Sequence, residues 1–531
     1  MASARVQWAA LLAALALVGT WHWGNDGLWF QGDAPRHAAT GLFFWDLLTT
    51  LPADPLAFAL SYYARYPVLV LGAYPPLFHF AEGLAFGLFG ASPFVARGLV
   101  LAGTGLAGAY TLAWGRRWIG PLAGWAGACT VLLPGVMRYS NAVLLNMPAA
   151  ALGLASLYHF HAWLDEGRGR DRTLFIVCAV ASVLTYYPGA IVLPVAVTWL
   201  LCTKGRARGR FLLILAALLG SLVLALAVTM PAHLARQVPS AARLLSPVNW
   251  IFYGRQLEDM VGAPWLLLAA AGAAAGLWWP AYRPATFRLV LACAAALTCL
   301  ALLPARDERY ALLLGPLLVL TAFVAIVMTV NAAGRHAGVT ATAVLAIMLG
   351  VSADAALRTP VTRVSGIDAV ARYLRDHGPE DAVLYSGIYD GVFGFYVRAL
   401  DPGYARRVVF SGRLLYEYRQ GVDFTWAETP HVASAEDVVR LIRTTSGCRW
   451  VAVEVGGEGL LSATEYWLRK ALEGPAFERV RSFPVQGRPV TRIDLYRFTL
   501  PLEPAQPLDL AFPSFSSRVF HGVEPIAAIH P

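Results

Sequence analysis

Charged residues are scarce in this chain of 531 residues, because Asp, Glu, Lys and Arg make up only 14% of it while 57% of its residues are hydrophobic. An ordinary soluble protein carries about a quarter charged residues. Residues 173–203 contain no charged side chain, and a bilayer-spanning helix needs about 20 apolar residues. The lack of charge excludes an ordinary soluble fold and predicts several membrane-spanning helices.

Cysteine is also scarce, and its placement argues against two further classes of protein. The chain has six cysteines, and only Cys448 lies outside the apolar segments. No CxxC spacing occurs. We therefore expect neither a disulfide framework nor a metal site held by paired cysteines. No metal-binding residue is assigned, and the need for a cofactor, a divalent metal included, stays open.

The net charge of +9 does not indicate a nucleic-acid-binding protein. The basic residues are nearly all arginine and lie in short groups between apolar stretches, whereas nucleic-acid binding needs a basic face or tail. Short cytoplasmic loops of membrane proteins collect Lys and Arg. We therefore use these groups as markers of the cytoplasmic side; they lie at 116–117, 168–172, 204–210, 283–288 and 335.

Placing all the arginine groups inside predicts about eleven transmembrane helices. Residues 173–203 form either one long helix or two short spans, and the Pro188-Gly189 break favours two. With an odd number of crossings and an inside amino terminus, everything after about residue 357 is predicted to lie outside the cytoplasm. The predicted spans are 6–24, 95–114, 120–135, 147–163, 173–187, 189–203, 211–229, 260–279, 288–304, 310–330 and 338–356.

The composition changes near residue 357 and predicts two domains. Residues 1–356 form the transmembrane domain, and residues 357–531 form an extracytoplasmic α/β domain with a Pro-rich tail after Pro501. Short apolar runs predict strands at 382–385, 407–410, 450–455 and 492–498. Helices are predicted at 434–444, which opens with a Ser-x-x-Asp cap, and at 464–473.

Two predicted extracytoplasmic loops are long, and long ordered loops often carry function. The first, 25–93, is rich in aromatic residues and proline and includes an amphipathic piece at 76–90 that we expect to lie as a helix on the membrane surface. The second, about 231–259, contains Arg255. These two loops are the first places to look for a site.

Asp33 stands in the first loop shortly after the first predicted helix. Near a lipid boundary a carboxylate loses solvation, which suits a general base that takes a proton from a hydroxyl. The alternative is an acid that only caps or anchors a helix. Position alone does not separate these two roles.

Three arginines at the outer ends of helices break the positive-inside pattern, namely Arg138, Arg306 and Arg309. A guanidinium at the interface can bind a lipid-borne phosphate through two hydrogen bonds. The alternatives are an ion pair with the neighbouring Asp307 or Glu308, or a side chain that only extends to the interface.

The order of these features resembles a known family, the GT-C membrane glycosyltransferases of the dolichyl-phosphate-mannose protein mannosyltransferase type, which includes the bacterial aminoarabinose transferases. The resemblance covers roughly residues 1–330. It rests on Asp33 after the first helix, Pro75-Pro76-Leu77, the segment Leu88–Arg97, Asn146-Met147-Pro148 and Arg309-Tyr310 at the start of a late helix.

The resemblance implies an inverting enzyme of the bacterial plasma membrane. Its donor would be a sugar carried on a polyprenyl phosphate, and its acceptor would be a protein, lipid or glycan outside the cytoplasm. By the resemblance, Asp33 is the catalytic base and Arg138, Arg306 and Arg309 bind the departing phosphate. Tyr74, Asn146 and Arg255 are the expected substrate-binding residues.

The chain departs from the family pattern at three positions. Ala34 follows Asp33 where the family usually has a second acid, Asn146 replaces an acid before Met-Pro, and Tyr74 replaces a histidine. An amide can orient a hydroxyl but cannot accept its proton. Two other functions are therefore kept open: a transporter or flippase of lipid-linked saccharides, and a non-catalytic binding protein on the same fold.

Overall fold

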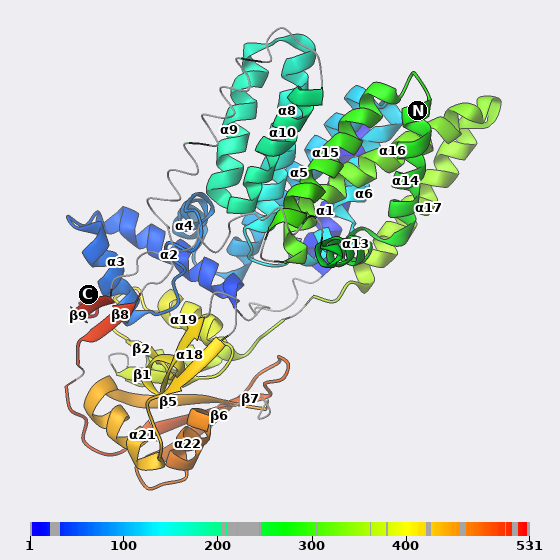
Figure 1. Cartoon of the computed structure of the whole chain (residues 1–531). Coiled ribbons are helices and arrows are strands. Elements are labelled where there is room, and N and C mark those ends of the chain that lie inside the picture. The colour runs from blue at the N-terminus through cyan, green and yellow to red at the C-terminus, as the bar shows by residue number, and fades with distance from the viewer. Residues whose placement is uncertain are drawn as a thin grey trace. The chain divides into compact units, whose positions relative to one another are not determined.

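The computed structural model describes most of the chain, and Figure 1 labels its helices and strands. Three stretches of the prediction lie outside the described part, namely the basic group at 204–210, the predicted span at 211–229 and residues 231–243. Within them, only residues 209 and 220 are described. The described residues are 3–21, 32–202, 209, 220, 244, 246–303, 306–361, 363–378, 381–420, 426–456, 463–504, 506–511 and 519–527.

The chain divides into two compact units that interleave along the sequence. The first unit contains residues 1–24, 72–78 and 97–361, and the second contains residues 25–71, 79–96 and 362–531. Most of the predicted first loop thus belongs with the carboxyl-terminal residues. The predicted domain boundary near residue 357 stays a prediction, and each unit is described by itself.

The first unit consists of helices, as its long apolar segments require, because a helix satisfies its backbone hydrogen bonds within one segment. Its longer helices are α1 (Ala4–Trp21), α5 (Pro93–Trp118), α8 (Asn146–Glu166), α9 (Gly169–Thr185), α10 (Val192–Cys202), α13 (Pro247–Val261), α14 (Ala263–Trp278), α15 (Arg283–Leu302), α16 (Leu314–Ala332) and α17 (Ala337–Arg358). The shorter ones are η1 (Pro121–Trp125), α6 (Ala126–Val131), α7 (Pro134–Ser140), η2 (Tyr187–Ile191), η4 (Glu308–Leu313) and η5 (Gly334–His336).

Five helical segments in the described part of the chain are long and apolar enough to cross a membrane. They are α1, α5, α15, η4 with α16, and η5 with α17; α13 and α14, bent by 110° at their junction, would add a sixth if they form one span. Most predicted spans within the described residues fall on helices, but 120–135 covers η1, α6 and the start of α7, and 260–279 crosses the bend between α13 and α14. The total of about eleven crossings stays a prediction.

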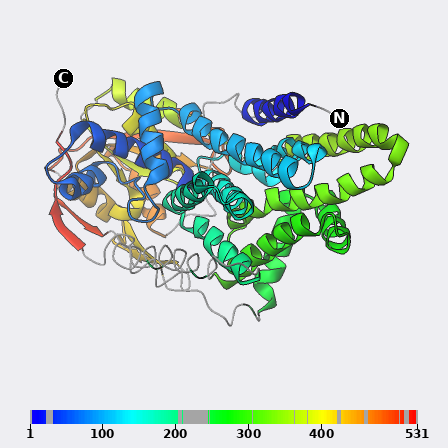
Figure 2. The same ribbon diagram turned by 90° about the horizontal axis from the view of Figure 1, so that it is seen from above.

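Residues 173–202 are divided between two main helices, so the hairpin alternative describes them better than one long helix. α9 ends at Thr185, η2 carries the Pro188-Gly189 break, and α10 follows from Val192. Gly189 lies so close to α9 that a Cβ there would come within 2.4 Å of Ser182 Oγ. Figures 1 and 2 show α8 and α9 side by side, in line with their direct packing.

The second unit begins with helices of the predicted first loop, α2 (Asp33–Thr50) and α3 (Pro55–Arg65), and includes most of α4 (Leu77–Phe89). Only α4 was predicted, as the piece at 76–90. Asp54 caps α3 by accepting hydrogen bonds from the backbone N–H groups of Leu56 and Ala57 at 2.9 and 3.0 Å. The first loop is therefore mostly helical.

The carboxyl-terminal part of the second unit contains a mixed five-stranded sheet of order β2-β1-β5-β7-β6. The strands β2, β1 and β5 are parallel, and β7 and β6 are antiparallel to their neighbours. The four predicted strands are confirmed, and β6 was not predicted. The bounds are β1 (Ala382–Ser386), β2 (Val408–Phe410), β5 (Cys448–Val455), β6 (Phe477–Pro484) and β7 (Arg492–Phe498).

Helices cover both faces of this sheet, as Figure 1 shows. On one face, α21 (Ala435–Leu441) and α22 (Ala463–Leu472) pack on Leu384, Val451 and Val453. On the other face, Tyr385 stacks on Phe393 of α19 with ring centroids 4.3 Å apart. Successive side chains of a strand point to opposite faces of the sheet, so the neighbouring residues Leu384 and Tyr385 contact different helices. The remaining elements are α18 (Ile367–Asp376), α19 (Asp390–Ala399), α20 (Ser411–Leu414), β3 (Tyr416–Gln420), β4 (Trp426–Pro430), β8 (Leu508–Ala511), β9 (Val519–Val523) and the π-helical turn η6 (Ile442–Ser446).

Candidate functional site

A cavity lies in the first unit where three breaks between helices meet. It is lined by the start of α8, the end of α9 with η2, and η4 before α16. Five of its lining residues have polar side chains, namely Asn146, Ser182, Tyr186, Arg309 and Tyr310. The cavity therefore brings together Asn146 and Arg309, which the sequence had placed in separate motifs.

Asn146 is the first residue of α8 and is only 5% exposed. Its Nδ2 atom is buried and has no hydrogen-bond partner among the described residues. A buried amide that donates no hydrogen bond costs free energy, which a ligand that accepts the bond would recover. Asn146 therefore brings an unsatisfied hydrogen-bond donor to the lining of the cavity.

Ser182 connects two of the helices that line the cavity, α9 and α8. Its hydroxyl donates to the backbone oxygen of Ala149 at 2.8 Å, which ties α9 to the first turn of α8. Gly153 allows a close approach on the same side, because a Cβ there would come within 3.0 Å of Val192 Cγ1. Helix packing thus fixes the position of Asn146.

Arg309 enters the cavity from η4, and Asp307 holds its side chain. The Asp307 carboxylate caps η4 by accepting from the Arg309 backbone N–H at 3.0 Å, and it accepts from Arg309 Nε and Nη2 at 2.8 and 2.5 Å. The ion-pair alternative raised for these arginines therefore applies to Arg309. A paired guanidinium stays charged and keeps a fixed direction.

Arg138 at the end of α7 is also in an ion pair. It donates to Glu308 at 3.0 Å, and the hydroxyl of Tyr139 donates to the same carboxylate. Arg138 does not line the cavity. Its predicted role in binding phosphate stays a prediction.

An aromatic row runs along the cavity. Tyr74 stacks on Tyr186 with centroids 5.9 Å apart, and Tyr186 packs against Tyr310 at 6.0 Å. Tyr186 and Tyr310 line the cavity. Tyr74, a predicted substrate-binding residue, thus reaches the cavity through Tyr186.

Arg306 and Arg255 lie outside the cavity lining and are exposed. Arg306 precedes η4, and within the described residues it has no ion-pair partner. Arg255 lies on α13. Of the three arginines predicted to bind phosphate, Arg306 is the one that no carboxylate of the described part of the chain holds.

Asp33 lies in the second unit as the first residue of α2, after ten residues outside the described part. One turn later, Arg36 forms an ion pair with Asp390 of α19 at 2.7 Å. Burial and this ion pair have opposite effects on the Arg36 pKa, and the attraction to Asp390 is larger, so the pKa is raised. Asp33 thus stands in a charged environment at the start of a helix, where a carboxylate is favoured by the helix dipole.

A buried histidine, His37, follows Asp33 on α2 and lies beside a second buried histidine, His79, on α4. His37 Nδ1 and His79 Nε2 are 2.9 Å apart, joining α2 to α4. Neither His37 nor His79 was predicted as a site residue. His37 comes four residues after Asp33, and that helical spacing is the signal that could have linked them.

A buried ion pair joins α2 to α19 further along the second unit. Arg398 donates to Asp46 at 2.5 Å, with side chains 7% and 8% exposed. Tyr62 donates to the same Asp46 oxygen at 2.7 Å. Asp46 is therefore a structural residue that attaches the first-loop helices to the carboxyl-terminal domain.

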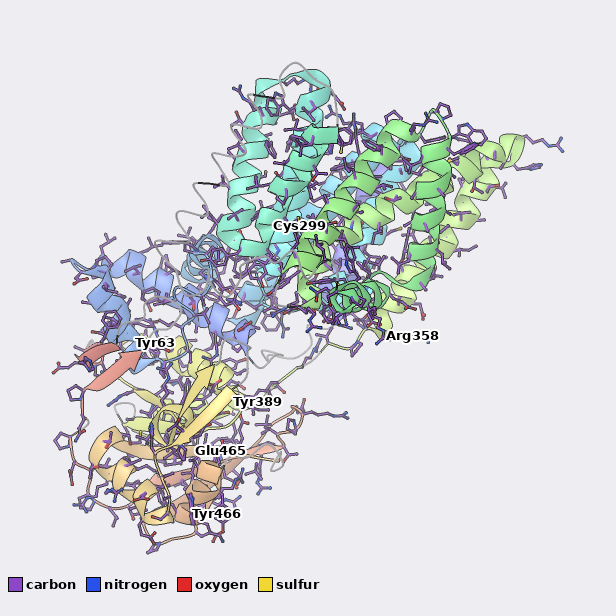
Figure 3. The ribbon with its side chains drawn as sticks, viewed as in Figure 1. Tyr63, Cys299, Arg358, Tyr389, Glu465 and Tyr466 are labelled. Atoms are coloured by element: carbon purple, nitrogen blue, oxygen red, sulfur yellow. The ribbon has the colours of Figure 1, made fainter. Side chains whose placement is uncertain are left out.

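A buried carboxyl group also stands beside the carboxyl ends of β1 and β5. Glu454 accepts hydrogen bonds from Tyr385 at 2.5 Å, from the Tyr389 backbone N–H at 2.8 Å and from the Ile388 backbone N–H at 2.9 Å. Figure 3 labels Tyr389 in this domain. Burial outweighs these hydrogen bonds and raises the pKa of Glu454 to about 7.

No metal site is evident in the part of the chain that the structure describes, since no group of three or more His, Cys, Asp or Glu side chains is arranged to hold an ion. The sequence prediction missed Ser182 and Tyr186. The signal for Tyr186 was its place in Tyr186-Tyr187-Pro188-Gly189 at a predicted outer turn. Ser182 gave no signal, because a serine inside an apolar helix is common.

The helical unit with its interhelical cavity and the α/β sheet domain define a class, the polytopic membrane proteins with a carboxyl-terminal α/β domain. No family model and no curated protein matches the sequence. Among solved structures, the chain is similar to ArnT from Cupriavidus metallidurans bound to undecaprenyl phosphate. The TM-score is 0.60 at 14% identity, and the match covers 94% of this chain and 100% of that one.

Two further solved structures have the same arrangement. The oligosaccharyltransferase of Archaeoglobus fulgidus, in complex with Zn and sulfate, matches with a TM-score of 0.57 at 12% identity over 89% of this chain and 71% of that one. The mycobacterial arabinofuranosyltransferase AftD matches with a TM-score of 0.55 at 17% identity over 96% of this chain and 41% of that one. These proteins are GT-C glycosyltransferases, so the chain has the GT-C fold, as predicted.

Proposed function

We propose that this protein is a glycosyltransferase that moves a sugar from a polyprenyl-phosphate donor to an acceptor on the outer face of the bacterial plasma membrane. The observation that carries the proposal is the cavity where Asn146 and Arg309 meet, in a chain with the GT-C fold. The structure of ArnT bound to undecaprenyl phosphate supports a lipid phosphate as the ligand.

In this proposal the first unit binds the donor. Asn146, Tyr186 and Tyr310 contact the sugar, and Tyr74 supports Tyr186 through their ring contact. Arg306 and Arg309 bind the phosphate, whose negative charge grows as its bond to the sugar breaks. Arg138 supports this end of η4 through Glu308, and Arg255 remains a proposed substrate contact.

Asp33 is the proposed general base. It takes the proton from the acceptor hydroxyl while the hydroxyl oxygen attacks the anomeric carbon. The bond between that carbon and the phosphate oxygen breaks, the polyprenyl phosphate leaves with the bonding electrons, and the configuration at the anomeric carbon inverts. Each step uses one acceptor and one donor, so no further reactant is needed.

A non-catalytic binding protein is the second candidate, because Asn146 stands where the resembling family has an acid. A transporter is less favoured, since the charged residues near the cavity, Arg309 with Asp307 and Arg138 with Glu308, lie at the ends of helices. Transporters place such groups at mid-membrane. Turnover separates the enzyme from both alternatives.

The test is release of polyprenyl phosphate from polyprenyl-phosphate sugars by the purified full-length protein. Asp33→Asn should lower the rate by about a hundredfold or more, the usual contribution of a general base. Asp54→Asn is the matched control in the same loop, because Asn caps a helix as well as Asp does and should keep α3 intact. Equal rates for the wild type and Asp33→Asn would remove Asp33 from its role, and no release by the wild type would favour a binding protein or transporter.

A further inference from the structure

The helix that begins with Asp33 is bound near both of its ends by one helix of the carboxyl-terminal domain. Near the start of α2, Arg36 donates to Asp390 of α19 at 2.7 Å. Further along, Asp46 accepts from Arg398 of α19 at 2.5 Å. The two helices also pack directly on one another. They therefore run side by side in the same direction, with an ion pair near each end.

The first ion pair lies where the starts of the two helices meet. Gly391 follows Asp390, and a Cβ there would come within 2.9 Å of Pro35 Cγ and 3.3 Å of Arg36 Cγ. Asp390 Oδ1 accepts from the Gly391 backbone N–H at 2.6 Å. The other oxygen of Asp390, Oδ2, accepts from Arg36. The start of α19 thus fixes the direction of the carboxylate that binds Arg36.

Two carboxylates lie within electrostatic reach of the Arg36 guanidinium. Asp33 precedes Arg36 by three residues on α2, a spacing that places the two side chains on the same side of the helix. Asp390 faces Arg36 from α19. The attraction to Asp390 raises the Arg36 pKa most, burial opposes it, and Asp33 adds a smaller rise. Arg36 therefore interacts with both acids and more strongly with Asp390.

The choice of partner for Arg36 matters because Asp33 is the proposed general base. A carboxylate in contact with an arginine binds a proton less readily, so it is a weaker base. An arginine that loses its own partner turns to the nearest remaining carboxylate. Without Asp390, that carboxylate would be Asp33 on the same face of α2.

The other titratable groups around this ion pair do not replace Asp390. Tyr63 of α3 lies near Arg36, but a neutral phenol supplies no counter-charge, and its hydroxyl accepts from Arg413. Glu454 of β5 lies near Asp390 and accepts from β1 and from the loop before α19. Within the described part of the chain, Asp390 is the carboxylate that forms the ion pair with Arg36.

We propose that Asp390 is a positioning residue for the glycosyl transfer: it holds Arg36 in an ion pair and so keeps this cation from pairing with Asp33, the general base. This inference rests on the proposed function and assigns a role in the same reaction to a residue of the carboxyl-terminal domain. Asp390 acts through Arg36.

The experiment measures kcat, KM and the pH dependence of kcat/KM for the purified full-length protein. Its substrate is the polyprenyl-phosphate sugar that the wild type cleaves in the release assay. Asp390→Asn should lower kcat about tenfold, because Arg36 then pairs with Asp33 and weakens the base, while KM stays within about twofold. The acidic limb of the pH profile should move by about one pH unit or more to lower pH, because a carboxylate paired with an arginine ionises at lower pH.

Further variants separate the loss of charge from damage to the fold. Asn can still accept from the Gly391 N–H, so Asp390→Asn should unfold at nearly the wild-type temperature. Asp390→Ser removes the same charge with a second residue that suits the start of a helix, and should give the same kcat and pH profile as Asp390→Asn. Asp390→Glu keeps the charge and should retain most of the wild-type kcat.

Two controls test whether the effect is specific to this ion pair. Asp376→Asn makes the same substitution in an exposed ion pair with Arg375 at the end of α18, and should leave kcat and the pH profile unchanged. Asp390 also raises the pKa of Glu454. The shift of the acidic limb should therefore be measured again in a Glu454→Gln background, where we expect it to persist.

The outcomes separate this proposal from the proposed function. Equal kcat values for the wild type and Asp390→Asn, or a lower kcat with an unmoved acidic limb, would overturn the positioning role and leave the proposed function standing. A shift that disappears in the Glu454→Gln background would also overturn it. No cleavage of any polyprenyl-phosphate sugar by the wild type would overturn both proposals.

Discussion

Glu454 shows how one residue can couple the carboxyl-terminal domain to pH. Its carboxyl group is 5% exposed and accepts bonds from the loop between β1 and α19. Burial raises its pKa from an ordinary 4.5 to about 7. Tyr385 and Tyr389 face the group as hydrogen-bond donors, and Asp390 at the start of α19 adds a further rise through its negative charge.

The raised pKa predicts that the domain loses stability as pH rises. Between pH 4.5 and 7 the folded state holds a proton on Glu454 that the unfolded chain has released, so the free energy of unfolding falls with increasing pH. The full effect is on the order of 3 kcal/mol. Glu454→Gln stays neutral at every pH, so thermal unfolding of the full-length protein should depend less on pH in this variant between about pH 5 and 8. The same pH dependence in both proteins would contradict the assignment.

At the residue scale, the sequence predicted candidate site residues but not which residues they contact. Asn146 and Arg309 stand in motifs whose order was informative, and the structure places both at one cavity. Whether Arg309 pairs with Asp307 could not be predicted, because the two residues are close along the chain in either case. The structure shows the ion pair, in which Asp307 accepts from the Arg309 backbone N–H and from its side chain, and the role of Arg309 in phosphate binding stays a prediction.

At the scale of elements, two glycines set the crossing of α2 and α4. A Cβ on Gly83 would come within 2.7 Å of the backbone oxygen of Gly41 and 3.0 Å of the Trp45 backbone nitrogen. Backbone atoms cannot move aside as the end of a flexible side chain can. The crossing therefore requires glycine at position 83.

Gly83→Val should destabilise the second unit by more than about 1 kcal/mol, as overpacking of a close contact usually does. The measurement is the midpoint of thermal unfolding of the full-length protein. Gly98→Ala on α5 is the control, because a Cβ there meets nothing within 4 Å and Ala is the better helix former. A Gly83→Val midpoint no lower than that of Gly98→Ala would show that the helices do not cross as described.

The strands of the sheet were predictable because apolar runs this short, bounded by polar residues, are typical of strands in a buried sheet. The helices α2 and α3 were missed because the prolines and aromatic residues of the first loop suggested irregular structure. In the structure two of these prolines lie in the first turns of the missed helices, with Pro35 third in α2 and Pro55 first in α3. Proline is tolerated there, since the N–H groups of the first turn have no partner within the helix.

At the scale of the whole molecule, the sequence predicts that the carboxyl-terminal domain lies outside the cytoplasm. That prediction depends on the number of crossings, and nearly all of residues 211–229, one of the predicted spans, are outside the described part of the chain. Hydropathy predicts where the membrane-spanning helices lie, whereas only the arginine groups predict on which side of the membrane each loop lies. The topology is therefore best tested by chemistry on the intact membrane.

Single cysteines in a cysteine-free background should show the two sides. Tyr466→Cys on the exposed face of α22 should react with a membrane-impermeant maleimide in cells whose plasma membrane is intact. Arg335→Cys in η5, a predicted cytoplasmic position, should react only after the membrane is permeabilised. The reverse pattern would place the domain in the cytoplasm and would remove the proposed outer-face reaction.

The central claim is that the cavity between α8, η2 and η4 binds the head of a polyprenyl phosphate. An experimental structure of the full-length protein with polyprenyl phosphate bound tests it most directly. We expect the phosphate to contact Arg306 or Arg309 at the cavity that Asn146 lines. A phosphate bound at another place, with this cavity closed to the lipid, would contradict the claim.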